Sequence, residues 1–262
     1  MSWRGRLVLW LILIVVFVGF YAIFNHTPGP STTAQSDAAF DRNIFIFVPG
    51  AFIAIFGFFT WRARKGAALA NAGLVLANQG RLSEGLVKID AARPYFVRGP
   101  QIPYFAGSVR LALWQLSVAE VELRKALKAT ALMNVKHLAV PKLALTLALL
   151  GRENATRNFL GDAEKLNVAA SPDSLVATAI LECRAARWES AARTLARNEL
   201  RNLGGPTRGL ADALRAWCSE QLTGQPQPFD LVAVLGEASI EGVRGSWPEL
   251  ASFLERAPRS AP

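Results

Sequence analysis

The sequence predicts an all-α fold in which a two-helix transmembrane hairpin precedes an α-solenoid of about four helical hairpins with capping helices. Two long uncharged runs lie within the first 61 residues. A pattern of small and apolar residues then recurs with the period of helical-hairpin repeats. Glycine and proline breaks separate further helical segments near the C-terminus. We therefore expect a membrane hairpin at 1–65, repeats at 66–200, and capping helices with a tail at 201–262.

The two uncharged runs, residues 7–24 and 43–61, are each long enough to cross a bilayer. About 20 apolar residues, rising about 1.5 Å each, span a hydrocarbon core of roughly 30 Å. A cleaved signal peptide is the alternative for the first run, because Arg4 and Arg6 precede it. Neither run contains Asp, Glu, Lys or Arg, so no residue there suggests transport or proton relay.

Basic residues beside the two runs predict the orientation of the hairpin. They are Arg4, Arg6, Arg62, Arg64 and Lys65. The connecting segment 25–42 holds two aspartates and a single arginine. Since basic flanks stay on the cytoplasmic side, we expect a multi-pass inner-membrane protein with both termini in the cytoplasm.

A repeat follows the second run and is best seen from four anchor positions. The anchors are Gly80, Trp114, Gly151 and Ala186, with spacings of 34, 37 and 35 residues. Seven residues before each anchor stands a small residue: Gly73, Gly107, Ala144 and Ala179. Five residues after each anchor stands another: Gly85, Ala119, Thr156 and Ala191. Small residues at a helix crossing let two backbones approach, so each anchor marks the turn of a two-helix hairpin.

Polar residues three positions after three anchors suggest how the second helices begin. Ser83, Ser117 and Asn154 are expected to cap these helices, and Ser117 with Glu120 has the spacing of a capping box. The second hairpin is less clear, because Trp114 stands where a turn is expected and one longer helix is the alternative. Pro141 is expected to start or kink the first helix of the third hairpin.

These residues resemble the tetratricopeptide repeat (TPR) family, over about half of the chain. The first hairpin carries the resemblance best, through Leu69, Ala72, Gly73, Leu76, Gly80, Arg81, Leu82, Gly85, Ile89 and Ala92. The resemblance implies a solenoid that binds proteins, with its concave face lined by the first helix of each hairpin. The implied groove residues are Leu74, Asn78, Phe105, Ser108, Leu145, Ile180 and Arg184. Because most are apolar, we expect a hydrophobic helix or extended segment as ligand. The alternative is that the chain's own C-terminal segment fills the groove.

The C-terminal segment predicts three helices after the Gly204-Gly205-Pro206 break. An amphipathic helix at 210–221 is expected to cap the solenoid. A short helix is expected at 230–241, and Pro248 is expected at the first turn of a last helix at 248–256.

The net charge of +9 is unevenly distributed. Residues 62–142 hold 13 basic and 4 acidic residues, whereas 143–262 hold 13 and 14. Excess positive charge beside a span favours contact with anionic lipid headgroups. Nucleic-acid binding is not expected, because no aromatic residues are interleaved with the basic ones.

Enzyme signatures are absent from the sequence. There is no phosphate loop, nucleophile elbow or HExxH motif. Cys183 and Cys218 have no metal-ligand spacing and are expected as small buried residues. Glu237 and Glu241 are expected on a solvated helix face. We therefore expect no catalytic activity, no cofactor and no metal site.

The expected function is that of a membrane-anchored scaffold or adaptor that binds a protein partner at the cytoplasmic face of a bacterial inner membrane. The order of two spans and helical repeats resembles HemY-type inner-membrane proteins. The alternative is a structural subunit of a larger membrane complex, in which the transmembrane hairpin makes the main contacts.

Overall fold

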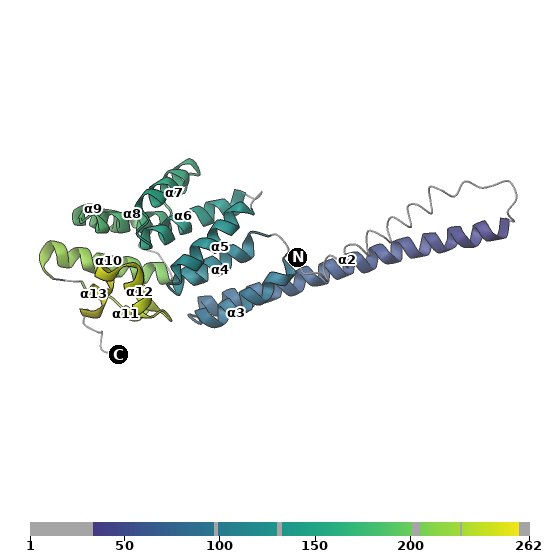
Figure 1. Cartoon of the computed structure of the whole chain (residues 1–262), viewed down its shortest axis with the longest axis horizontal. Coiled ribbons are helices and arrows are strands. Elements are labelled where there is room, and N and C mark those ends of the chain that lie inside the picture. Colours follow the sequence, from purple (N-terminus) through teal and green to yellow (C-terminus); the bar gives the residue numbers. More distant parts are fainter. Residues whose placement is uncertain (1–33, 97–98, 130–132, 201–204, 226, 257–262) are drawn as a thin grey trace. The chain divides into compact units, whose positions relative to one another are not determined.

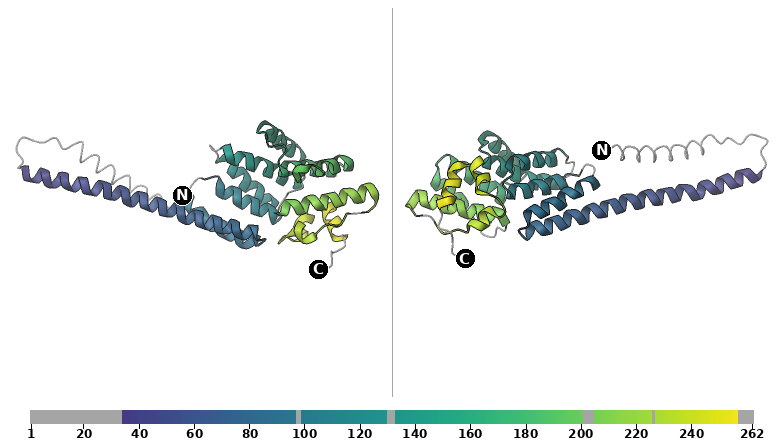
Figure 2. Two further views of the ribbon diagram at one scale, coloured as in Figure 1. Left: turned by 180° about the vertical axis from the view of Figure 1, so that it is seen from behind. Right: turned by 60° about the horizontal axis from the view of Figure 1, so that its bottom comes forward.

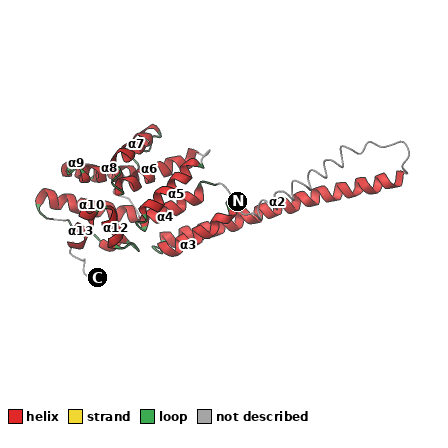
Figure 3. Cartoon of the chain, viewed as in Figure 1, coloured by secondary structure: helices red, strands yellow, loops and turns green. Residues whose placement is uncertain are grey.

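The structure is a computed structural model of the chain and describes residues 34–96, 99–129, 133–200, 205–225 and 227–256. Every regular element in these ranges is a helix, and they contain no strand (Figure 3). The prediction of an all-α fold is confirmed. The chain divides into two compact units, Met1–Lys65 and Gly66–Pro262.

The first described helix, α2, spans Ala34–Asn78. It contains the whole of the predicted second span, 43–61, and continues as the first helix of the first hairpin. The predicted first span, 7–24, lies outside the described residues. Within the described ranges, no helix combines the length and the hydropathy that crossing a membrane demands. The transmembrane hairpin therefore stays a prediction.

The helices after α2 follow one another as antiparallel pairs (Figure 1). Their bounds are α3 Leu82–Ala92, α4 Gln101–Ala112, α5 Leu116–Lys128, α6 Met133–Leu149, α7 Glu153–Lys165, α8 Pro172–Arg184 and α9 Trp188–Leu195. Short 3₁₀ turns follow α3 at Arg93–Tyr95 and α9 at Asn198–Leu200. Within Gly66–Pro262, α5 packs on α6, and α6 packs on α8, so that neighbouring pairs stack.

The four anchor residues share one backbone conformation. Gly80, Trp114, Gly151 and Ala186 all have positive φ, at 84°, 57°, 73° and 54°. Each donates its N–H to the carbonyl three residues earlier, and the next residue donates to the carbonyl five residues earlier. This is the Schellman motif, in which a left-handed residue ends a helix and satisfies its free carbonyls. The same motif at four similarly spaced positions shows that the anchors mark four interhelix turns.

The predicted helix caps are wrong. Helices α3, α5 and α7 begin at Leu82, Leu116 and Glu153, so that Ser83, Ser117 and Asn154 already lie inside the first turn. The N-cap residues are Arg81, Gln115 and Arg152, and none of their side chains makes a capping hydrogen bond. The physical reason is the short connection, because a Schellman turn of three residues leads directly into the next helix.

The second hairpin is a true hairpin, with α4 and α5 separated at Trp114. Its positive φ of 57° breaks the helix where the alternative prediction had one continuous helix. Pro141 lies inside α6, eight residues after its first residue, and therefore does not start that helix.

The small residues of the repeat lie where the two helices of a hairpin cross. A Cβ atom added to Gly73 would lie 2.7 Å from the carbonyl oxygen of Gly85, and the reverse substitution would meet Gly73 equally closely. Ala119, Thr156 and Ala191, which follow the other anchors, have no exposed surface. These positions admit only small side chains because the backbones are in contact.

Four helices follow the fourth hairpin and complete the fold. They are α10 Gly205–Thr223, α11 Leu231–Leu235, α12 Ile240–Ser246 and α13 Pro248–Arg256. Helix α13 has the predicted bounds, whereas 230–241 holds the whole of the short helix α11, a turn and the first residues of α12. Helix α10 packs on α8, α9 and α11, and Figure 2 shows the yellow helices α11–α13 beside it in both views.

An aromatic cluster joins these last helices to the fourth hairpin. The Trp217 ring in α10 lies 5.1 Å from that of Trp188, 5.4 Å from that of Trp247 and 5.9 Å from that of Phe253, measured between centroids. Trp247 is only 2% exposed. Such a cluster buries a large apolar area, so α10–α13 belong to the core of this unit.

Candidate functional site

The predicted groove residues have different environments in the structure. Leu145 and Ile180 are buried in the main core, with 2% and 0% exposure. Leu74 and Phe105 are half-buried against the smaller core of the first two hairpins. Asn78 is exposed at the end of α2, and Ser108 is half-buried in α4. The seven residues therefore do not form one continuous open groove.

The C-terminal helices cover part of the face that is formed by the first helix of each hairpin. Arg184 of α8 donates to the carbonyl oxygen of Ser246 at 3.1 Å, and its guanidinium lies over the ring of Trp247. At the first hairpin, the N–H of Ser83 donates to Glu237 Oε2 at 2.8 Å. The C-terminal segment thus covers the predicted groove at Arg184 and also reaches the first hairpin at Ser83.

An open pocket of about 80 Å³ is left between α4, α6, α10 and α11. Its lining residues are Ser108, Leu111, Ala112, Trp114, Lys142, Leu145, Leu149, Thr207, Leu210 and Val234. Two of the predicted groove residues, Ser108 and Leu145, are among them. One water needs roughly 10–15 Å³ of such space, so the pocket has room for several heavy atoms, such as the end of one Leu or Ile side chain.

The polar side of the pocket is formed around Lys142. Its Nζ lies 3.1 Å from Asp173 Oδ2, and Thr207 Oγ1 donates to Asp173 Oδ1 at 3.3 Å. Burial lowers the pKa of Lys142, but the Asp173 carboxylate and the nearby Tyr104 outweigh it, so that the net pKa is raised. Lys142 therefore stays charged and paired, and the pocket combines an apolar floor with a neutral ion pair.

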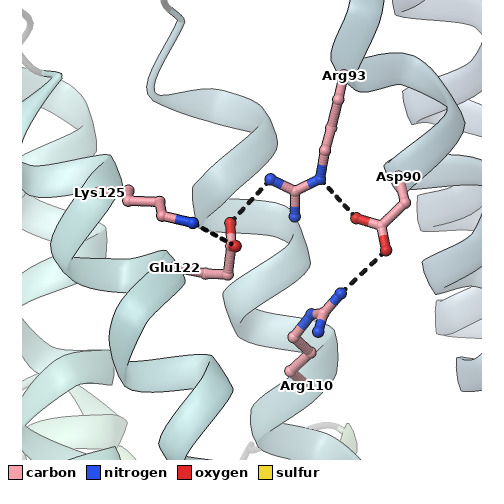
Figure 4. Close-up of polar contacts among 5 residues, drawn as sticks. All are labelled: Asp90, Arg93, Arg110, Glu122 and Lys125. Atoms are coloured by element: carbon pink, nitrogen blue, oxygen red, sulfur yellow. Dashed lines mark hydrogen bonds and ion pairs between the residues drawn. The ribbon is translucent and has the colours of Figure 1, made fainter.

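A second polar cluster links neighbouring hairpins (Figure 4). Glu122 of α5 accepts from Arg93 Nη1 at 3.0 Å and from Lys125 Nζ at 3.1 Å. Asp90 accepts from Arg93 Nε at 2.7 Å and from Arg110 Nη2 at 3.0 Å. Helices α3, α4 and α5 all contribute, and the Glu122 side chain is only 7% exposed. The cluster fixes how the first hairpin packs on the second.

Glu120 has a corresponding role one hairpin further along. It accepts from Arg124 Nε at 2.9 Å and from Arg152 Nη1 at 2.8 Å. Glu120 was expected to complete a capping box, and the structure shows it joining α5 to the start of α7 instead.

The basic residues that were predicted to lie near a membrane, Arg62, Arg64 and Lys65, lie on α2 within Met1–Lys65. The Lys65 ammonium is 5.3 Å from the centroid of the Trp61 ring, a cation–π contact. These residues line no part of the described pocket.

The two cysteines are close neighbours in the core. Cys183 Sγ of α8 and Cys218 Sγ of α10 are 3.7 Å apart, and both residues are buried thiols. The contact with Cys218 and burial raise the pKa of Cys183. Buried neutral thiols pack as small apolar groups, which is the environment that was expected for them.

Several polar contacts of these sites were not predicted from the sequence. Lys142 and Asp173 are 31 residues apart, and Glu237 and Ser83 are 154 apart, so spacing along the chain gives no signal for either pair. The signal that was available is the four-residue spacing from Glu120 to Arg124, which places the two side chains on one helix face. Among the described residues, no group of three or more His, Cys, Asp or Glu is placed to hold a metal ion.

The fold and pocket define a class of protein, an all-α chain built from successive helical hairpins that are closed by C-terminal helices. Comparisons with protein-family models, with curated proteins and with solved structures find no match to this chain.

Proposed function

We propose that the chain is a membrane-anchored TPR-type adaptor, without catalytic activity, that binds a hydrophobic segment of a protein partner on the cytoplasmic side of a bacterial inner membrane. The pocket between α4, α6 and α10 carries this proposal. It lies on the face that TPR-type solenoids use for ligands, and it is open, apolar and large enough for one aliphatic side chain. The four turns of shared geometry support the TPR-type assignment.

The pocket's chemistry favours a peptide over a charged small molecule. Leu111, Leu145 and Leu210 supply apolar surface, on which an aliphatic anchor residue gains from leaving water. The Ser108 hydroxyl and the Lys142–Asp173 pair lie beside it and can bond the amide groups of an extended backbone. A free carboxylate or phosphate is less favoured, because Asp173 already neutralises Lys142.

The proposed attachment to the membrane is supported by the side chains at residues 53–61 of α2. Ile53, Phe56, Phe59 and Trp61 are exposed by 73%, 71%, 49% and 56%. At about 100° per residue these four side chains, together with Phe58, which is 44% exposed, are distributed around the helix. A helix that is apolar on all sides is stable when lipid or protein surrounds it. The basic residues Arg62, Arg64 and Lys65 follow directly.

Site-specific photocrosslinking in native membranes tests partner binding. A photoreactive residue at Ala112 lies on the pocket wall, and the control is placed at Ser117, which is exposed on α5. We expect a defined protein adduct from position 112 that position 117 does not give. Binding of the protein so identified, measured with both purified proteins, should be lost in Ala112→Trp, which fills the pocket, and kept in the exposed control Ala129→Trp. Equal adducts from both positions would argue against the pocket.

The exposed residues of α2 favour a second candidate, a structural subunit whose membrane helices make the main contacts. Phe56 and Trp61 would then face protein instead of lipid. A photoreactive residue at Phe56 distinguishes the two functions. A strong protein adduct from position 56 with none from position 112 favours the subunit.

The predicted orientation is tested by labelling intact cells with a membrane-impermeant maleimide. Ser31→Cys lies in the predicted outer loop and Ser117→Cys in the predicted cytoplasmic domain. We expect the first to be labelled directly and the second only after the membrane is permeabilised. The reverse pattern would contradict the orientation.

A further inference from the structure

The outward surfaces of α3 and α5 carry exposed valines beside lysines. We call this surface the Val–Lys face, and its residues are Val87, Lys88, Val118, Val121 and Lys128. The three valines are exposed by 67%, 44% and 49%. The buried residues of the same helices, such as Ile89 and Leu123, point the other way into the cores. The face is therefore an unpartnered apolar surface in this structure.

Two of the valines occupy corresponding positions in the first two hairpins. Val87 and Val121 each follow their anchor by seven residues, so they occupy equivalent positions in successive hairpins. The C-terminal end of α3 is linked to α5, because Arg93, directly after α3, bonds Glu122 of α5 at 3.0 Å (Figure 4). Equivalent positions on adjacent helices of a stacked array face the same direction.

The charge of this region is positive because its carboxylates are already paired. The acidic residues of 62–142 are Glu84, Asp90, Glu120 and Glu122, and each is held by at least one arginine. Within the described ranges, Lys88 and Lys128 have no carboxylate at ion-pair distance. Their ammonium groups remain available beside the valines.

In the described part of the chain, the pattern of exposed valines beside unpaired lysines ends after the second hairpin. The positions equivalent to Val87 and Val121 are Asn158 in α7 and Arg193 in α9. The position equivalent to Lys128 is Lys165, which pairs with Asp162 at 2.9 Å. Among the described repeats, the position seven residues after the anchor is thus valine only in the two hairpins nearest in sequence to the basic residues Arg62, Arg64 and Lys65.

We propose that the Val–Lys face docks on an anionic lipid surface. This proposal rests on the membrane anchor of the proposed function, which would hold residue 66 at the bilayer. Lysines near anionic headgroups are attracted electrostatically, and small apolar side chains between them enter the headgroup region. The mixture of isolated valines and ammonium groups matches such an interface better than the concave apolar pockets that hold a protein segment.

The test uses the full chain reconstituted in nanodiscs of phosphatidylcholine alone or of phosphatidylcholine mixed with phosphatidylglycerol. An environment-sensitive fluorophore is attached to Val87→Cys, Val121→Cys or the matched control Asn158→Cys. The native cysteines are 3% and 1% exposed and are protected from labelling. We expect a blue shift at positions 87 and 121 in anionic discs, reversed by high salt, and no shift at position 158.

Variants that remove lysine charges test whether the blue shift depends on the lysines of the Val–Lys face. Lys88→Gln with Lys128→Gln should abolish the blue shift at position 121, while the control Lys165→Gln should keep it. Equal emission from positions 121 and 158 in anionic discs would overturn the proposal. So would a shift that appears only in native membranes, which would indicate a protein partner.

Failure of the chain to co-elute with nanodiscs would contradict the anchor of the proposed function. Vesicles of the same two lipid compositions, added to the labelled protein, would then test the face alone. The absence of a shift at position 121 with those anionic vesicles would overturn docking independently.

Discussion

The guanidinium carbon of Arg184 lies 4.4 Å from the centroid of the Trp247 ring. Arg184 Nη2 also donates to the carbonyl oxygens of Leu149 at 2.8 Å and of Ser246 at 3.1 Å. One side chain therefore connects the third hairpin, the fourth hairpin and the C-terminal helices. Burial lowers the pKa of Arg184, and Glu249 partly opposes this effect.

Replacing Arg184 with lysine should destabilise the protein. Lysine keeps the charge but loses the planar group that stacks on the indole and bonds two carbonyls, which we expect to lower the free energy of unfolding by about 1–2 kcal/mol. Urea denaturation followed by tryptophan fluorescence measures this change. The control Arg187→Lys, at an exposed position that has no such stacking or carbonyl contact in the described part of the chain, should change it by less than about 0.5 kcal/mol. Equal effects would contradict a specific role for the Arg184–Trp247 contact.

Gly209 should not tolerate alanine. A Cβ atom there would overlap the backbone of Ala233 and Val234, because α10 and α11 are in direct contact. We expect Gly209→Ala to destabilise by about 1–3 kcal/mol through overpacking. Gly161 in α7 is the matched control, since a Cβ there meets nothing within 4 Å. Gly161→Ala should stabilise by roughly 0.5–1 kcal/mol through helix propensity, and thermal melts of both variants would show opposite signs.

Glu122 should contribute more to stability than a typical surface glutamate. Its side chain is 7% exposed and accepts from Arg93 and Lys125, so Glu122→Gln should cost about 1–3 kcal/mol. The control is Glu153→Gln, whose partner Arg157 and own carboxylate are both exposed. An exposed pair of this kind is worth roughly 0.5 kcal/mol or less. Similar denaturation midpoints for the two variants would show that the buried cluster is not stabilising.

Glu237 should make stability depend on pH in the acid range. Hydrogen bonds from Ser83 hold the pKa of Glu237 below its ordinary value. A carboxylate with a lowered folded-state pKa stabilises above its unfolded value of about 4.3, and the contribution disappears as pH falls through the folded-state value. Because the group is largely exposed, we expect less than about 1 kcal/mol at neutral pH. Wild type and Glu237→Gln should therefore differ at pH 7 and converge in strong acid, and a constant difference would contradict the mechanism.

The hairpin register could be predicted from the sequence because it depends on local rules. The small residues five positions after each anchor are buried as expected, and all four anchors end a helix. The left-handed conformation of Trp114 and Ala186 could not be read from residue type, since positive φ normally favours glycine. Spacing identified these two turns where composition did not.

The polar contacts between distant helices could not be predicted. Glu237 was expected on a solvated helix face, yet it lies in a turn and accepts from the first turn of α3. The Lys142–Asp173 pair likewise depends on how α6 packs on α8. Both contacts arise from the relative placement of helices, which periodicity within one helix does not determine. The groove could not be predicted for the same reason. Of its seven expected residues, Ser108 and Leu145 line the pocket.

The contact between Ser83 and Glu237 joins residues at the two ends of the Gly66–Pro262 unit. Open repeat arrays gain stability from nearest neighbours alone, and their terminal repeats can fray while the centre stays folded. Here Glu237, in the turn after α11, bonds the first turn of α3, so that opening of either end has to break this contact. This contact between residues 154 positions apart should couple the two ends weakly and form late in folding, since distant segments must meet before it can form.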